Sequence, residues 1–133
     1  MEEPILRVTH LQKYYGVRGN VTRAIDDLGF SVRAGEFVGI MGASGSGKTT
    51  LLNCIATIDA VTAGEIFIDG QDITRLPRRA LSRFRRERLG FVFQDCNLLD
   101  TLTGGENIAL ALTILRRPAG EIPRQVQETA ALL

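Results

Sequence analysis

The sequence has few cysteines, and their spacing forms no motif. Its 133 residues include two, Cys54 and Cys96, which stand far apart and make no Cys-x-x-Cys pair. That spacing excludes a zinc ribbon and a dithiol redox motif. We expect both side chains to be buried thiols of a protein that works in a reducing compartment.

An excess of charge of either sign is also lacking. Sixteen Lys and Arg side chains oppose fifteen Asp and Glu, which leaves a formal net charge of +1. Because the overall field is weak, nothing draws the whole surface to nucleic acid or anionic lipid, and we expect any binding site to be local. A composition of 44% hydrophobic and 23% charged residues is typical of one ordinary globular domain, which needs neither a disulfide nor a metal to form a core.

No apolar run reaches the ~18 residues that a membrane-spanning helix needs. Asp59 and Arg116 interrupt the longest candidates. The first residues, Met-Glu-Glu-Pro, also lack the basic start and apolar core of a secretory signal. These absences favour a cytosolic protein.

Apolar periodicity predicts an α/β chain. The predicted strands are 5–11, 27–33, 36–41, 64–70 and 89–93, and the predicted helices are 48–58, 76–88, 104–115 and a segment from 123 onward. The runs 36–41 and 89–93 are almost entirely apolar, as in strands that are covered on both faces. Residues 14–20 contain two glycines and predict a loop. Thr103 and Glu106 fit a capping box at the start of a helix.

A glycine-rich loop joins the apolar run 36–41 to the predicted helix 48–58. Its residues are Gly42, Ala43, Ser44, Gly45, Ser46, Gly47, Lys48 and Thr49. This is the phosphate-loop pattern Gly-x4-Gly-Lys-Thr, in the strand-to-helix context that its mechanism requires. Glycines let successive N–H groups converge on phosphate oxygens, and the helix adds its positive dipole end. We expect the Lys48 ammonium to reach the β and γ phosphates and the Thr49 hydroxyl to bind Mg²⁺.

The loop alone does not identify which phosphate-loop enzyme this is. A second residue of the magnesium site should follow a strand. Asp69 closes a glycine-bounded hairpin and is most simply a turn residue. After the run 89–93, either Gln94 or Asp95 could face the nucleotide. A small-molecule or nucleotide kinase would use Asp95, and this alternative stays open on the residues alone.

Several stretches together resemble the nucleotide-binding subunit of an ABC transporter. They are the phosphate loop, Gly64-Glu-Ile with Asp69-Gly70, the stretch from Arg85 to Gln94, and the stretch from Asn97 to Thr103 followed by Glu106-Asn107. More narrowly, residues 43–53, 57–59 and 91–95 resemble the ATPase subunits of bacitracin-type antimicrobial-peptide exporters and their macrolide and lipoprotein relatives. The resemblance implies a P-loop NTPase (RecA-like) α/β core with a small antiparallel β subdomain and the start of an α-helical subdomain.

The resemblance also implies site residues, with ATP and Mg²⁺ as the cofactors. The nucleotide would be held by the phosphate loop and by Thr50, which follows it. Lys48 and Gln94 would be the catalytic residues, because Gln94 resembles the Q-loop glutamine that touches Mg²⁺ and the attacking water. Thr49 and Gln94 would be the metal ligands. Tyr15 matches the aromatic residue that stacks on adenine, and Tyr14 is its rival.

Other motifs of the family do not occur in these residues. There is no Leu-Ser-Gly-Gly-Gln signature, no later strand that ends in Asp-Glu, and no switch histidine, because His10 is too early and is expected to be a structural surface residue. We therefore expect residues 1–133 to be the N-terminal part of a nucleotide-binding domain that ends inside its helical subdomain. This piece should bind ATP weakly and turn it over negligibly. A non-catalytic remnant is the other alternative.

The full-length protein is expected to act with partners. The resemblance implies a head-to-tail dimer with a second copy and a separate membrane permease, at the cytoplasmic face of the cell membrane. Antimicrobial peptides or related amphiphiles would be exported. Arginines crowd residues 75–88, but no aromatic platform accompanies them, so we expect a solvated helix face and no nucleic-acid partner.

Overall fold

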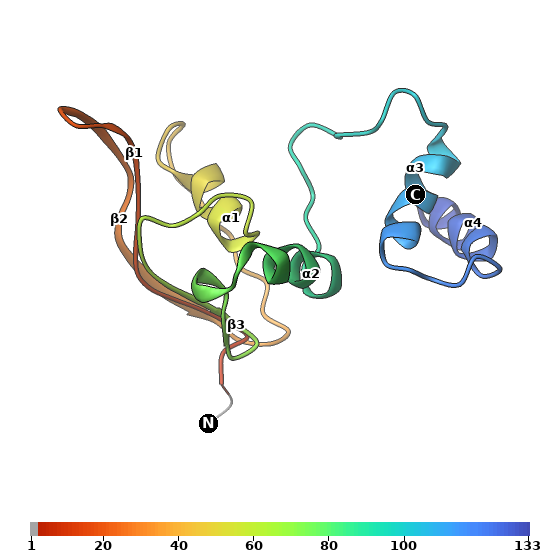
Figure 1. Ribbon diagram of the computed structural model, residues 1–133, viewed down its shortest axis with the longest axis horizontal. Helices are drawn as coiled ribbons and strands as arrows, with labels where there is room; N and C mark the ends of the chain where they lie inside the picture. The colour runs from red at the N-terminus through yellow and green to blue at the C-terminus, as the bar shows by residue number, and fades with distance from the viewer. Residues whose placement is uncertain (1–2) are drawn as a thin grey trace. The chain divides into compact units, whose positions relative to one another are not determined.

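The computed structural model describes residues 3–133. The chain divides into two compact units: the first ends at Arg85, and the second is Arg86–Leu133 (Figure 1). The first unit holds an antiparallel sheet, and the second holds two helices. Within residues 3–133, no helix combines the length and the apolar character needed to cross a membrane. These elements fit the expected mixture of α and β structure.

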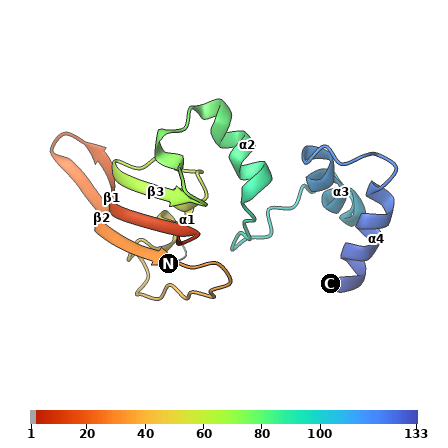
Figure 2. The ribbon, with the colours of Figure 1, turned by 90° about the horizontal axis from the view of Figure 1, so that it is seen from below.

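The sheet has four antiparallel strands in the order β2-β1-β3-β4 (Figure 2). They are β1 (Leu6–Val17), β2 (Asn20–Val32), β3 (Ala63–Ile68) and β4 (Gln71–Asp72). β1 and β2 form one long hairpin whose turn contains Gly19 at a φ of 94°. The predicted loop over 14–20 was therefore wrong for most of its length. Residues 14–17 pair with residues 20–23 instead, because a two-residue turn suffices to reverse the chain.

The β1–β2 hairpin is irregular near its middle. Its register shifts between Val8 and Tyr14, and His10 and Asp27 both adopt positive φ there, 47° and 55°. Such bulges increase the local twist and interrupt the alternation of side chains. The His10 and Asp27 side chains contact each other at 2.6 Å on the exposed surface. His10 is thus an exposed residue, as predicted from the sequence.

The core of the first unit lies between the sheet and the helix α1 (Lys48–Ile55). Its buried apolar residues are Val8, Leu11, Ile25, Leu51, Cys54, Ala56, Ile66, Ile68, Ile73 and Phe84. Burial raises the pKa of the Cys54 thiol, as expected for an unreactive core cysteine. The short helix η1 (Ile73–Arg75) and α2 (Arg78–Arg88) follow the sheet. Arg85 ties α2 to the end of α1, because its guanidinium donates to the Thr57 carbonyl at 2.8 Å.

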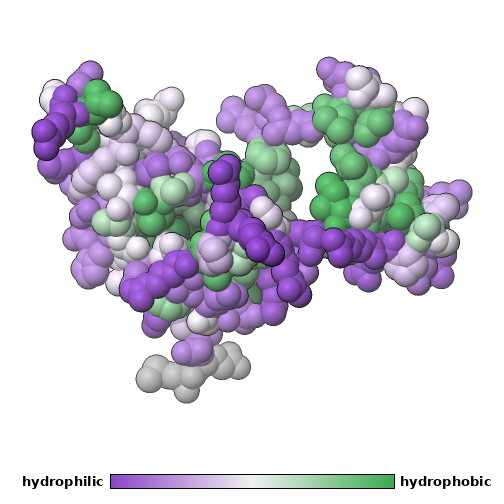
Figure 3. Space-filling view, viewed as in Figure 1, coloured by the Kyte–Doolittle hydropathy of each residue, from purple (hydrophilic) through white to green (hydrophobic). Residues whose placement is uncertain are grey.

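The second unit consists of α3 (Gly104–Ile114) and α4 (Ile122–Leu132), which pack on each other. Thr103 and Glu106 form the predicted capping box, with both reciprocal hydrogen bonds present. Neither helix contains a buried residue, and hydrophobic surface gathers over this unit in Figure 3. Cys96 is exposed, so the prediction of a second buried thiol was wrong.

The two apolar runs 36–41 and 89–93 are not strands. Phe37 is fully exposed, and Val92 is 96% exposed. A strand is held by hydrogen bonds to a neighbour. Within residues 3–133 neither run has a partner strand, because the only sheet there is the four-stranded one. The apolar composition of these runs is typical of a strand covered on both faces, but a strand also needs hydrogen bonds to a neighbouring strand.

Candidate functional site

The glycine-rich loop lies at the surface of the first unit, directly before α1. Residues 42–46 are exposed, and one backbone hydrogen bond closes the loop, from the Ser46 N–H to the Ala43 carbonyl at 3.1 Å. The first hydrogen bond of the helix runs from the Leu51 N–H to the Gly47 carbonyl. The N–H groups of the first turn, 48–50, therefore have no partner within the helix. A loop with free amides at a helix start is suited to hold an anion.

Gly47 occupies a position that no other residue fits well. Its φ is 90°, in the left-handed region. A Cβ added there would lie 2.4 Å from the carbonyl oxygen of Ala24 on β2. Gly45 has a similar φ of 80° but open space around it. The glycine pattern thus has two causes, the turn at Gly45 and the close approach to β2 at Gly47.

The Lys48 side chain folds back over the loop. Its ammonium donates to the carbonyl oxygens of Gly42 at 2.8 Å and Ala43 at 2.7 Å, and it lies 3.1 Å from the Ser46 hydroxyl. An ammonium has three donors, so these contacts use all of them. A bound phosphate would have to exchange with one or more of these oxygens. The positive charge is thus already placed at the loop.

Thr49 and Thr50 lie in the first turn of α1, and their side chains differ in exposure. Thr49 is exposed, so its hydroxyl is accessible for a Mg²⁺ ion bound beside the loop. The hydroxyl is an oxygen ligand of the kind that Mg²⁺ takes, and the donor chemistry therefore fits the metal. Thr50 is half-buried, and its side chain lies close enough to Tyr15 to lower the pKa of the tyrosine. This contact brings the tyrosine next to the phosphate loop.

Tyr15 lies in a polar cluster with two other side chains. Its hydroxyl donates to one Asp59 oxygen at 2.6 Å, and the Lys13 ammonium donates to the other at 2.9 Å. Lys13 also donates to the Ala60 carbonyl and lies 4.8 Å from the centre of the Tyr15 ring. Lys13 and Tyr15 share a face of β1 because they are two residues apart. Lys13 and Asp59 had no predicted role, although a lysine on a buried face of a strand requires a partner.

The cluster shifts three pKa values. The hydrogen bond from Tyr15 and then that from Lys13 lower the pKa of Asp59 below its ordinary value. Burial opposes the charge on Lys13, but the hydrogen bond and the charge of Asp59 outweigh it, so the pKa of Lys13 is raised. The hydrogen bond to Asp59 raises the pKa of Tyr15, and the Thr50 contact partly offsets this. At neutral pH the three groups are therefore an ammonium, a carboxylate and a neutral phenol.

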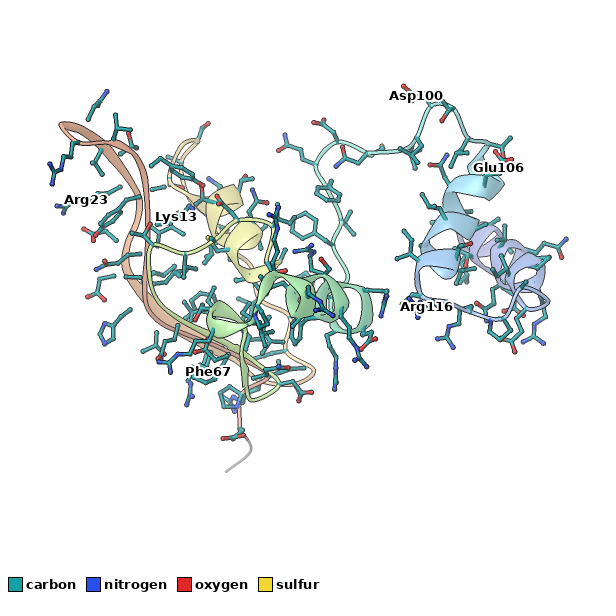
Figure 4. All side chains as sticks on the ribbon, viewed as in Figure 1. Lys13, Arg23, Phe67, Asp100, Glu106 and Arg116 are labelled. Atoms are coloured by element: carbon teal, nitrogen blue, oxygen red, sulfur yellow. The ribbon has the colours of Figure 1, made fainter. Side chains whose placement is uncertain are left out.

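Tyr14 has separate partners. Its hydroxyl donates to Asp26 at 2.6 Å, and the Arg23 guanidinium lies 5.5 Å from its ring centre. In Figure 4, Lys13 lies on the side of β1 towards α1, whereas Arg23 lies on the other side of the hairpin. Of the two tyrosines, Tyr15 is the one beside the first turn of α1.

The structure does not bring all predicted site residues into one unit. Tyr15 and residues 42–50 belong to the first unit. Gln94 and Asp95 are exposed residues of the second unit, between α2 and α3. The roles considered for Gln94 and Asp95 thus remain predictions from the sequence.

Comparison with protein families identifies one match, the ABC transporter family model, over residues 25–133. The chain is 49% identical to the ABC transporter ATP-binding protein YxdL of Bacillus subtilis over 97% of its own length, and 46% identical to the bacitracin export ATP-binding protein BceA of Halalkalibacterium halodurans, also over 97%. It covers 50% and 51% of these two proteins. The chain thus spans about half the length of the curated relatives it matches.

The same fold occurs in a solved ATP-binding cassette. A dimeric cassette in a post-hydrolysis state, bound to ADP and Pi, matches with a TM-score of 0.86 and 36% identity. The match covers 92% of this chain and 54% of the cassette chain. The architecture expected from the sequence, part of a phosphate-loop α/β cassette, is therefore confirmed.

Proposed function

This chain belongs to the ABC transporter family, and from that premise we propose that it binds Mg-ATP through residues 42–50 as part of a transporter's ATP-binding subunit. The observation that carries the proposal is the arrangement at the start of α1. The Lys48 ammonium lies against the exposed loop 42–46, and the first helical turn, whose amides have no partner within the helix, follows directly. The ADP and Pi bound to the solved cassette support a nucleoside polyphosphate as the ligand.

Each part of the loop has a distinct role in this proposal. The backbone amides and Lys48 bind the phosphate oxygens, and Tyr15 stacks on the base. Thr49 supplies a hydroxyl to Mg²⁺. When bound, the ion neutralises charge on the phosphates. Gln94 would add a second contact to the metal and orient the attacking water.

For the whole protein, we propose ATP hydrolysis coupled to transport. Its partners would be a membrane permease and a second copy of the subunit, and the dimeric state of the solved cassette supports the second. The protein would work at the cytoplasmic face of the membrane. Export of antimicrobial peptides is supported by the relative named for bacitracin export, at 46% identity, against 41% or less for the relatives named for methionine import. Family membership argues against the kinase alternative based on Asp95.

Binding calorimetry on the purified chain tests the proposal. Mg-ATP should bind, and Lys48→Ala should weaken the affinity at least tenfold, because a charge-assisted hydrogen bond is worth about 1.5–3 kcal/mol. Arg116→Ala, in the second unit, is a control for the loss of one positive charge. Absence of heat with Mg-ATP, for a chain that is folded by circular dichroism, would refute the proposal. Equal affinities of the wild type and Lys48→Ala would refute the assigned role of the lysine.

A further inference from the structure

The two adjacent tyrosines on β1 are held in similar ways but at different places. Each hydroxyl donates to a carboxylate at 2.6 Å, and each ring has a cation near one face. Only Tyr15 also contacts α1, through Thr50. The pair therefore offers an internal comparison between a tyrosine beside the phosphate loop and one away from it.

Asp59 fixes the hydroxyl end of Tyr15. The carboxylate follows α1 in the chain and accepts from Tyr15 with one oxygen and from Lys13 with the other. Its own position is held because Lys13 also donates to the neighbouring Ala60 carbonyl. A phenol bound at its oxygen retains little freedom to rotate about its side-chain bonds. The ring plane of Tyr15 is thus set by Asp59.

Lys13 covers one face of the same ring. Its ammonium lies 4.8 Å from the ring centre, and its side chain is 11% exposed. Tyr15 is nevertheless 42% exposed. Since the hydroxyl and one face are in contact with protein, the exposed part includes the opposite face. A flat ligand can stack only there.

The open face lies beside the start of the phosphate loop helix. The Thr50 side chain that contacts Tyr15 belongs to the first turn of α1, directly after Thr49. A ligand whose phosphates sit on the loop would therefore carry its base near this ring. Stacking on an aromatic ring needs a fixed plane more than a particular base, since every base has a π face.

We propose that Asp59 and Lys13 are positioning residues that hold the Tyr15 ring with one face open for the base of the bound nucleotide. The proposal rests on the proposed function, because it concerns the same nucleotide. It predicts that the preference for a nucleotide over a bare triphosphate depends on Asp59, although Asp59 touches neither ligand. Affinity for the phosphate part alone should not depend on it.

The experiment compares Mg-ATP with Mg-tripolyphosphate, which has no base. The chain has two tyrosines and no tryptophan, so Tyr14→Phe leaves Tyr15 as the only emitter. In this background we expect Mg-ATP to quench the tyrosine fluorescence and to bind about tenfold more tightly than tripolyphosphate. Adding Asp59→Asn, which keeps the size of the side chain, should reduce the ratio to about two- or threefold and weaken the quenching. Tripolyphosphate affinity should stay within about twofold.

Two further variants serve as controls. Tyr15→Phe leaves Tyr14 as the only emitter, and its fluorescence should not respond to Mg-ATP. This variant keeps the ring but loses the bond to Asp59, so its affinity ratio should fall as in Asp59→Asn. The midpoint of urea unfolding, measured for each variant, shows that the variant is folded.

The outcomes separate the two proposals. An unchanged affinity ratio in both Asp59→Asn and Tyr15→Phe, with tripolyphosphate still bound, would overturn the positioning role and leave phosphate binding intact. An equal loss of affinity for both ligands in Asp59→Asn would also overturn it, because that pattern marks a general structural effect. If the wild type binds neither ligand, the proposed function and this inference both fail.

Discussion

Removing Lys13 or Asp59 should destabilise the first unit by unequal amounts. The two side chains form a 2.9 Å ion pair, but Lys13 is 11% exposed and Asp59 is 32% exposed. If Asp59 is replaced by Ala, the Lys13 ammonium stays largely buried with the Ala60 carbonyl as its remaining partner. If Lys13 is replaced by Met, Asp59 keeps the Tyr15 hydroxyl and gains water at its exposed side. The first change should therefore cost more.

The magnitudes follow from these environments. A hydrogen bond to a charged group is worth about 1.5–3 kcal/mol, and breaking a fully buried ion pair costs about 3–5 kcal/mol. Because Asp59 is one-third exposed, we expect less than the buried limit, about 2–3 kcal/mol for Asp59→Ala. Methionine retains most of the packing of the lysine stem, so Lys13→Met should cost about 1 kcal/mol. The double variant should reveal a coupling of about 1–2 kcal/mol.

The effect should also depend on pH. The folded-state pKa of Asp59 lies below its ordinary value of 3.8, so its contribution is present above pH 3.8 and is lost as pH falls through the folded pKa. The pKa of Lys13 is raised above 10.5, so its contribution is present below pH 10.5 and is lost as pH rises through the folded value. The stability difference between wild type and Asp59→Ala should thus be constant from about pH 5 to 9 and should shrink in strong acid.

Urea unfolding followed by tyrosine fluorescence measures this prediction. Both tyrosines lie on β1, so their emission reports the first unit alone. Midpoints should shift without a change in slope, since the surface exposed on unfolding is nearly the same. A Lys13→Met variant that is as destabilised as Asp59→Ala would contradict the argument. So would a coupling below about 0.3 kcal/mol at pH 7.

Three other changes test the remaining parts of the chain. Gly47→Ala should destabilise the chain by about 1–3 kcal/mol more than Gly45→Ala. Of these two positions, only at Gly47 does the new Cβ meet a carbonyl oxygen, 2.4 Å away on β2. Equal urea midpoints for the two variants would contradict this. Thr103→Ala should cost α3 about 1 kcal/mol through loss of its cap, seen as earlier thermal loss of helical circular dichroism, and an unchanged melting curve would speak against it. The 133-residue chain should release phosphate from ATP no faster than Lys48→Ala, and a rate clearly above that variant would disprove the expected low turnover.

Features that depend on neighbours in the chain were predictable from the sequence. The capping box at Thr103 and Glu106 involves groups three residues apart, and both of its bonds are present. The phosphate loop is likewise local, and the structure places it before α1 as predicted. The turn at Asp69, which has a φ of 50°, is a third example. In each case the residues that make the contacts are also adjacent in the sequence.

Features that depend on distant residues were not predictable in the same way. The cluster of Lys13, Tyr15 and Asp59 joins β1 to the residues after α1, and no pattern in the sequence pairs them. Lys13 and Tyr15 stand two residues apart on β1 and both reach Asp59, although the register of the hairpin shifts between Lys13 and Tyr14. Propensity indicates what each segment prefers, but the partner across space decides which side chains meet.

The two apolar runs, 36–41 and 89–93, also depend on distant residues, and here the predicted structure did not form. Residues 36–41 have the composition of a covered strand and directly precede the phosphate loop, yet they contain fully exposed Phe37. A helix satisfies its backbone within its own residues, so α1 forms from local sequence. A strand must find its partner elsewhere, and among residues 3–133 this run has none. Gly47 instead contacts α1, through the hydrogen bond from the Leu51 N–H, and approaches the Ala24 carbonyl on β2. The comparison of Gly47→Ala with Gly45→Ala tests how much that approach to β2 contributes to stability.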